Sequence, residues 1–395
     1  MAWMIDIERL DPNQKEIFNR KLETNIWIKG FAGSGKSVLL IHKLKKILYD
    51  EPEVKVCIVV YTWSMIDLFK TAMNELGMSS TIPVITYLKF DKEPIEKKYD
   101  YIFCDEVQDL PENVLVLMNN KLNSDGKIIV AGDSNQSIYE GKVDPQKIGE
   151  ILGGAKEESL FYVHRLTRTI MNAVQKILPS ANMWGAGKEY TQPDKSIFLN
   201  KAEKEENEVE FVYNEALKGP DSSYGNAQET SAILIPTRKN IIKFIQLLLQ
   251  HFETPLWIEK KADKFGNLDF VDLNNHLRQN NIRIQYIGNG TGSLEDAVQK
   301  KDIILMTYHS SKGLDFDNVF LPFMAWDLFI DKFKPATLLM VAITRTKKNL
   351  CISYTGNLHD KIKMLTFDKS IDIIERSIGV EKKAESDNDG FDIGL

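Results

Sequence analysis

The sequence predicts an α/β protein with two parallel-sheet domains, each flanked by helices. Apolar runs of strand length alternate with helix-length segments from residue 26 to about 155, and the alternation resumes from 232 to 354. Such alternation is typical of parallel sheets that carry helices on their faces. The length of 395 residues also suits two or three domains better than one.

The first domain is expected over residues 1–155 and the second over 156–380. In the first, we expect strands at 26–28, 54–61, 99–104 and 127–131, and helices that include 38–41, 65–76 and 113–122. In the second, we expect strands at 232–235, 302–306, 318–321 and 349–354, and helices at 240–251 and 336–342. Each boundary follows the change from a short apolar run to a segment of helical periodicity.

Three stretches interrupt this pattern. Residues 180–229 and 261–300 lack clear periodicity and contain clusters of Gly, Pro, Ser and Asn, so we expect loops or small inserted pieces on the surface of the second domain. Residues 381–395 are acidic and polar, and we expect them to form a disordered tail.

Composition excludes several classes of protein. With 43% hydrophobic and 27% charged residues, the chain resembles an ordinary soluble protein, and no apolar stretch is long enough for a membrane span. The three cysteines, Cys57, Cys104 and Cys351, lie in separate apolar runs without a Cys-x-x-Cys pair, which argues against disulfides and zinc and favours the cytoplasm. A net charge of −6 argues against a protein that coats nucleic acid through bulk positive charge. It does not exclude a local basic groove that binds nucleic acid.

The most informative motif is a phosphate-binding loop between the first strand and the first long helix. It reads Gly30, Phe31, Ala32, Gly33, Ser34, Gly35, Lys36, Ser37. The glycines let successive backbone N–H groups wrap a polyphosphate, Lys36 reaches the β and γ oxygens, and the Ser37 hydroxyl suits Mg²⁺. The motif therefore predicts a protein that binds a nucleoside triphosphate, with ATP and Mg²⁺ as the expected ligands.

A second motif places carboxylates at the end of the strand 99–104. Asp105 can hold Mg²⁺ at this position, together with Ser37. Glu106 can polarise the water that attacks the γ-phosphate. A polar cap on a strand would explain the cluster without catalysis, but its combination with the phosphate loop favours a hydrolytic site.

With these motifs in hand, the chain resembles a UvrD/Rep-type superfamily 1 DNA helicase, and motifs of that family run in order from Gln14 to Arg345. The resemblance implies two RecA-like domains, the tandem core of P-loop NTPases. The segment 10–14 is similar to the family's adenine-reading motif, in which the Gln14 amide pairs with the base. The segments 105–109 and 132–139 match two further motifs, and the second implies that Gln136 couples the γ-phosphate to the nucleic-acid path.

The resemblance assigns the remaining nucleotide contacts to the second domain. Arg165 takes the place of an arginine that reaches the γ-phosphate, with Arg168 as the alternative. The long motif 307–316 brings Gly313 and Asp315 to the nucleotide, and Arg345 takes the arginine-finger position. The transition-state charge would then be neutralised only when the two domains close, and such a finger contributes about 10³–10⁵ in rate.

Nucleic-acid contacts are less clear. The family pattern implies contacts from Tyr61, Thr62, Tyr139 and His309, but an aromatic such as Tyr61 at a strand end can also be core packing. After Tyr139 the family usually has a tryptophan that stacks on a base, whereas this chain reads Glu140-Gly141-Lys142. His164 replaces a tyrosine that stacks on adenine, and it could stack or be an ordinary surface histidine.

The family's two inserted subdomains have no room in this chain. Only about a dozen residues separate Phe90 from the next strand, too few for a folded unit, so we expect a compact motor core. The favoured function is an ATP-driven single-stranded DNA translocase or helicase of 3′-to-5′ polarity, with RNA possible as the strand. The alternative is an accessory ATPase that works with a partner such as a nuclease, and an inactive structural relative is a third possibility.

Overall fold

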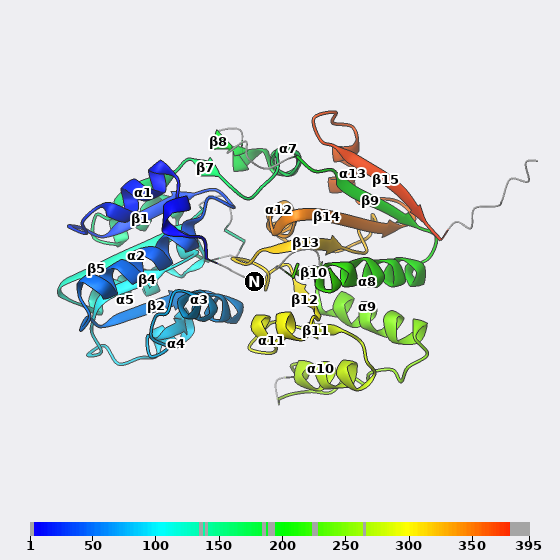
Figure 1. The fold of residues 1–395 in the computed structure, drawn as a ribbon, viewed down its shortest axis with the longest axis horizontal. Coiled ribbons are helices and arrows are strands. Elements are labelled where there is room, and N and C mark those ends of the chain that lie inside the picture. Colours follow the sequence, from blue (N-terminus) through cyan, green and yellow to red (C-terminus); the bar gives the residue numbers. More distant parts are fainter. Residues whose placement is uncertain are drawn as a thin grey trace, which may run out of the picture.

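The computed structural model describes residues 4–133, 137–138, 141–183, 187–188, 194–222, 228–263 and 266–379. Figure 1 shows two lobes side by side, the first in blue and cyan and the second in green to red. Each lobe is built on one parallel sheet, with six strands in the first and seven in the second. This confirms the predicted fold class. Gln136, Tyr139 and the expected tail at 381–395 lie outside the described residues.

The first sheet has the strand order β3-β2-β4-β5-β1-β6, and all its pairs are parallel. Its strands are β1 (Ile26–Gly30), β2 (Val56–Val60), β3 (Val84–Thr86), β4 (Tyr99–Cys104), β5 (Leu122–Gly132) and β6 (Lys156–Leu160). Its helices are α1 (Pro12–Asn19), α2 (Lys36–Asp50), α3 (Trp63–Glu75), α4 (Tyr87–Asp91), α5 (Glu112–Asn120) and α6 (Ile148–Ile151). Because β6 pairs with β1, the first sheet extends to Leu160, past the boundary expected at 155.

Alternating side chains explain why this sheet is buried on both faces. Ile58 and Val60 of β2 pack into one apolar cluster, whereas Cys57 and Val59 pack into another on the opposite face. All five residues of β2 are buried. A strand covered on both faces reads as a continuous apolar run, which is why sequence alone located it.

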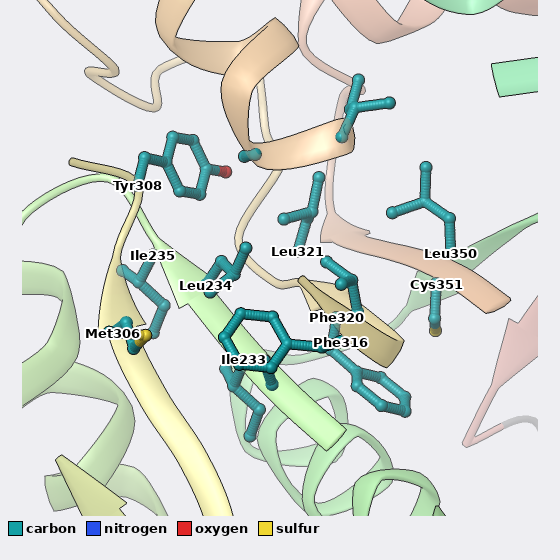
Figure 2. Packing of buried hydrophobic residues seen from close by; sticks show 14 of the residues in the cluster. Ile233, Leu234, Ile235, Met306, Tyr308, Phe316, Phe320, Leu321, Leu350 and Cys351 are labelled. Carbon is teal, nitrogen blue, oxygen red and sulfur yellow. The ribbon is translucent and has the colours of Figure 1, made fainter. Parts of the chain in front are cut away.

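The second sheet has the order β11-β12-β10-β13-β14-β9-β15, again with parallel pairs throughout. Its strands are β9 (Ile197–Ala202), β10 (Ser231–Ile235), β11 (Ile284–Tyr286), β12 (Ile303–Thr307), β13 (Phe316–Leu321), β14 (Thr346–Thr355) and β15 (Ile373–Ile378). Its helices are α7 (Arg168–Ile177), α8 (Glu205–Asp221), α9 (Arg238–His251), α10 (Phe270–Gln279), α11 (Leu294–Gln299), α12 (Pro335–Ile343) and α13 (Asp360–Thr366). Figure 2 shows residues of β10, an interior strand, beside Met306 of β12 and Phe316 and Phe320 of β13.

Minor elements complete the fold. A two-stranded parallel ladder joins β7 (Tyr162–Val163) to β8 (Gly187–Lys188) beside α7, at the top of Figure 1. Short 3₁₀ turns occupy Ile7–Arg9, Val107–Asp109, Pro145–Lys147 and Pro179–Ala181. Within the described ranges, no helix combines the length and apolar character needed to cross a membrane.

Both stretches expected to be surface loops or small inserted pieces contain helices and strands of the second domain, so that expectation is wrong for residues 197–221 and 270–299. The first contains β9, which lies between β14 and β15, and the helix α8, whose residues Val209, Val212 and Ala216 are buried. The second contains α10, the strand β11 and α11, and β11 forms one edge of the sheet. Polar residues on the outward faces of these elements hid their apolar periodicity.

Helix α8 carries a buried carboxylate into this core. Glu208 is fully buried, and its Oε1 accepts hydrogen bonds from the Phe323 backbone N–H (2.6 Å) and the Ser353 hydroxyl (2.8 Å). Burial raises the pKa of Glu208 to about 7. Phe323 has a φ of +63°, in the left-handed region, so Glu208 holds a strained turn at the end of β13.

The connection from α4 to β4 is as short as the sequence predicts. Lys121, fully buried, donates from Nζ to the carbonyls of Phe90 (2.8 Å) and Glu93 (3.0 Å) on this connection. Its ammonium also lies 4.5 Å from the centre of the Phe90 ring. The short connection expected at this place is therefore a closed turn held by hydrogen bonds from Lys121.

Candidate active site

The phosphate loop lies between β1 and α2 and depends on two glycines. Gly33 and Gly35 both have a φ of +78°, a conformation that residues with a Cβ rarely adopt. Gly35 is also the N-cap of α2, so the first turn of this helix directs its backbone N–H groups toward the loop. This geometry is the cradle in which helix N-termini bind phosphate.

Lys36 is held inside this cradle. Its ammonium donates to the carbonyls of Gly30 (2.9 Å) and Phe31 (3.0 Å), and the residue is 8% exposed. A buried ammonium whose hydrogen bonds go to neutral carbonyls gains from exchanging them for the oxygens of an anion. The residues present therefore fit a polyphosphate.

Ser37 and the carboxylates meet beside the loop. The Ser37 hydroxyl donates to Asp105, whose other oxygen accepts from the Glu106 N–H at 2.9 Å. These two oxygen donors suit Mg²⁺, with the remaining ligands left to water and phosphate. Burial and the charge of Glu106 raise the pKa of Asp105.

Glu106 occupies a strained and polarised position. Its φ is +54°, in the left-handed region, which is uncommon for a residue other than glycine and frequent at functional sites. Gln108 donates to its carboxylate at 2.6 Å. Burial would raise the pKa of Glu106, but Lys312 and Lys36 outweigh burial and hold it below the usual value. Glu106 is thus an ionised carboxylate, suited to accept a proton from water.

The second domain contributes two arginines to the same pocket. Arg165 donates to Asp315 (2.7 Å) and to the carbonyl of Thr344 (2.8 Å). Asp315 also pairs with Lys347 at 2.6 Å, and these two cations overcome burial to lower its pKa to about 2. Asp315 therefore fixes the direction of Arg165 through a permanent charge.

Arg345 is 3% exposed and is positioned by its own domain. It donates to the carbonyls of Val341 (2.8 Å) and Leu314 (2.9 Å) and to the Thr344 hydroxyl (3.0 Å). Burial and the charge of Arg165 lower its pKa to about 10, so it stays charged at neutral pH. Such a preorganised guanidinium costs little reorganisation when phosphate charge develops nearby.

One pocket joins these groups across the two domains. Its walls include Lys36, Ser37 and Glu106 from the first domain and Arg165, Asp315 and Arg345 from the second. Gly33, Gly35 and Gly313 line it as well. The structure thus brings together the groups that the sequence placed hundreds of residues apart, while their individual catalytic roles stay predictions.

Sequence reasoning missed an ion pair that bridges the domains below this pocket. Lys312 of the second domain lies 2.5 Å from Asp109 and 3.9 Å from Glu106 of the first, and its side chain and that of Asp109 are at most 1% exposed. Both residues stand inside recognised motifs, which was the available signal.

Gln14 lies beside the loop with its amide already engaged. Its Nε2 donates to the carbonyl of Ser34 (2.9 Å) and its Oε1 accepts from the Asp11 N–H (3.0 Å), which closes a capping box on α1. His164 pairs with Asp11 at 2.7 Å, and its backbone N–H donates to Gly33 at 3.0 Å. Both residues therefore support the loop's shape, and an adenine contact by either stays a prediction.

The expected nucleic-acid residues lie on both domains. Tyr61 stacks on Tyr87 with ring centres 5.1 Å apart, and the Lys142 ammonium lies 5.2 Å and 5.4 Å from the two rings. Thr62 caps α3 through the Met65 N–H at 3.3 Å. His309 is largely enclosed, and burial lowers its pKa. Tyr61 is therefore at least partly a packing residue, as the alternative interpretation proposed.

Fold and pocket together define a P-loop ATPase whose active site is shared between two domains. Residues 14–142 match the model of an AAA domain, and residues 257–357 match that of a UvrD-like helicase C-terminal domain. The two matched segments are similar to an AAA domain and to a UvrD-like helicase C-terminal domain, in agreement with the resemblance that the motifs carry. No curated protein matches the chain.

Three solved structures are similar in fold at low identity. The arterivirus nonstructural protein 10 helicase has 15% identity over 87% of this chain and 61% of that one, with a TM-score of 0.41. The PRRSV helicase has 13% identity over 87% and 54%, also with a TM-score of 0.41. The complex of the arterivirus helicase with DNA has 16% identity over 83% and 60%, with a TM-score of 0.41. The chain thus spans only 54% to 61% of the length of these proteins.

Proposed function

We propose that the protein couples ATP hydrolysis at the domain interface to movement along single-stranded nucleic acid, with DNA as the favoured strand. The pocket shared by Lys36, Glu106, Arg165 and Arg345 carries this proposal. A site split between two domains is sensitive to their separation, so binding and hydrolysis of ATP would close and open the cleft. The 3′-to-5′ direction rests on the family resemblance alone.

In the proposed mechanism each residue acts on the triphosphate or on the attacking water. Lys36 exchanges its two carbonyl partners for the β and γ oxygens, as the P-loop lysine does in this class. Glu106 accepts the proton of the water. Ser37 and Asp105 would hold Mg²⁺, which neutralises charge on the phosphate oxygens when bound. Arg165 and Arg345 neutralise the charge that develops as the γ-phosphate departs.

The proposal is tested by measuring ATP turnover while titrating single strands, duplexes and overhangs of both polarities. Single-stranded DNA should raise the rate several-fold, and Lys36→Ala should abolish hydrolysis. Lys29→Ala is a matched control, since Lys29 lies on β1 beside the loop but pairs at the surface with Glu157 (2.5 Å). A rate that no DNA or RNA alters would refute the proposal.

A second candidate function is an accessory ATPase that acts only with a protein partner such as a nuclease. The closed turn pinned by Lys121 favours this candidate, because the compact core lacks the inserted unit through which larger relatives could act alone. Purification of the native complex, followed by ATPase assays with and without the partner, distinguishes the accessory function from an autonomous translocase. A chain whose ATPase responds to DNA only with its companion present supports the accessory function.

A further inference from the structure

Three exposed aromatic side chains gather on one loop of the second domain. Trp326, Phe329 and Phe333 are 68%, 61% and 58% exposed, and they lie within eight residues between β13 and α12. We call residues 325–334 the aromatic loop. Large exposed aromatic groups are unfavourable in water, so such a cluster usually marks a binding surface.

The aromatic loop is held in one conformation by its backbone. Leu328 and Ile330 alternate with the exposed rings and are buried at 9% and 4% exposure. The Trp326 N–H donates to the Asn357 carbonyl (2.8 Å) at the start of the loop. Near its end, one oxygen of Asp331 accepts from the backbone N–H groups of Phe333 (2.8 Å) and Lys334 (2.6 Å). The rings are therefore presented outward by a preformed turn.

The loop also reaches the first domain. Lys334 donates from Nζ to the Ser137 carbonyl at 2.8 Å, in the segment that follows β5. The stacking tryptophan expected a few residues further along this segment is replaced by Glu140-Gly141-Lys142 in the sequence. Asp331 lies close enough to His309 to influence its charge electrostatically, so the loop also borders the motif 307–316.

We propose that the aromatic loop binds single-stranded nucleic acid by stacking unpaired bases on Trp326 and Phe329. This inference rests on the proposed function and names a contact surface for the strand. The Lys332 ammonium lies 5.0 Å from the Phe333 ring centre, where it covers that ring and offers a charge to a phosphate.

The charged residues of the aromatic loop favour contact between its rings and the bases of the strand rather than its phosphates. Asp331 is engaged in its turn, whereas the exposed Asp327 lies between the two stacking residues and repels phosphates. We therefore expect bases rather than the backbone to face Trp326 and Phe329. Stacking of this kind tolerates any base, and it serves DNA and RNA alike.

The test compares a double variant, Trp326→Ala with Phe329→Ala, with the unaltered protein. Affinity is measured by fluorescence anisotropy for labelled oligothymidylate and oligouridylate of about 20 nucleotides. We expect binding to weaken by about 5-fold to 150-fold for each ring lost, which corresponds to about 1–3 kcal/mol. Basal ATPase activity should be unchanged, because neither ring lines the nucleotide pocket.

Two controls isolate stacking. Phe367→Ala removes a ring that is 76% exposed at the end of α13 in the same domain, and it should leave affinity unchanged. Trp326→Phe with Phe329→Tyr keeps two stacking surfaces and should retain most of the affinity. An oligonucleotide of abasic sites should bind the unaltered protein as weakly as it binds the double variant.

The outcomes separate this inference from the proposed function. If the unaltered protein binds and responds to single strands but the double variant does so equally well, the inference is wrong and the proposed function stands. The inference is also wrong if the double variant loses a protein partner while its affinity for nucleic acid is unchanged. Failure of the unaltered protein to bind any single strand overturns both.

Discussion

The buried pair Lys312 and Asp109 makes the interface between the domains sensitive to a single substitution. At 2.5 Å and an effective dielectric constant of about 20, their attraction is about 7 kcal/mol before desolvation is counted. Burial nevertheless raises the pKa of Asp109 to about 6, so desolvation offsets much of that attraction. The intact pair contributes little net stability, whereas a lone Asp109 carboxylate would be costly.

We therefore predict that Lys312→Met lowers the free energy of unfolding by about 3–5 kcal/mol at pH 8. The raised pKa means that Asp109 takes up a proton as the protein folds at acidic pH. Lys312 lowers the pKa of Asp109, so removing it raises this pKa above about 6. Protonation of Asp109 then removes the unpaired charge at acidic pH, and the loss should shrink as pH falls. Urea unfolding at pH 5.5 and pH 8 measures both effects.

The double variant Lys312→Met with Asp109→Asn is the internal control. It removes both charges and should recover most of the lost stability, because no buried charge is left without its partner. Asp109→Asn alone should cost less than Lys312→Met, since Lys312 keeps Glu106 at 3.9 Å. A Lys312→Met variant that unfolds like the unaltered protein at both pH values would refute the reasoning.

Three further predictions concern catalysis and the core. Glu106→Gln should bind ATP with nearly unchanged affinity but hydrolyse it about 10²–10⁴-fold more slowly, which equilibrium binding and phosphate release measure separately. Arg345→Lys should lower the ATP turnover number of the folded protein by about 10³-fold or more, and equal turnover would remove Arg345 from the mechanism. The pKa of Glu208 rises from 4.5 to about 7 on folding, so its stabilising contribution is lost as pH increases through 7. Glu208→Gln should thus stabilise the protein by about 3 kcal/mol at pH 8 and little at pH 4.5 in thermal melts, and an equal effect at both would contradict it.

Much of the fold was predictable because its strands are buried on both faces. The run 54–61 reads as a strand because all its residues except Lys55 are apolar or aromatic, and the structure places β2 within it. The phosphate loop was predictable because Gly33, Gly35 and Lys36 must stand at fixed spacings around a phosphate. These signals are local, so a single sequence carries them.

The signals that failed depend on context or on distance in the chain. Helix α8 begins with three acidic residues in its first turn and contains Pro220, which masked its buried positions 209, 212, 213 and 216, although these have helical spacing. Strand β9 pairs with β14 across about 150 residues, and nothing local specifies that register. The pairing of Lys312 with Asp109 likewise follows from the packing of two domains rather than from either motif.

The anchor formed by Lys121 has a consequence for how this architecture can diversify. Grafting an extra subdomain next to α4 would displace the carbonyl of Glu93, one of the two that accept from the fully buried ammonium of Lys121. The ammonium of Lys121 would then be buried without one of its hydrogen-bond partners unless Lys121 were replaced at the same time. Adding a subdomain here therefore needs two changes, the insertion and the replacement of Lys121, and the insertion alone is destabilising. This favours keeping the short connection.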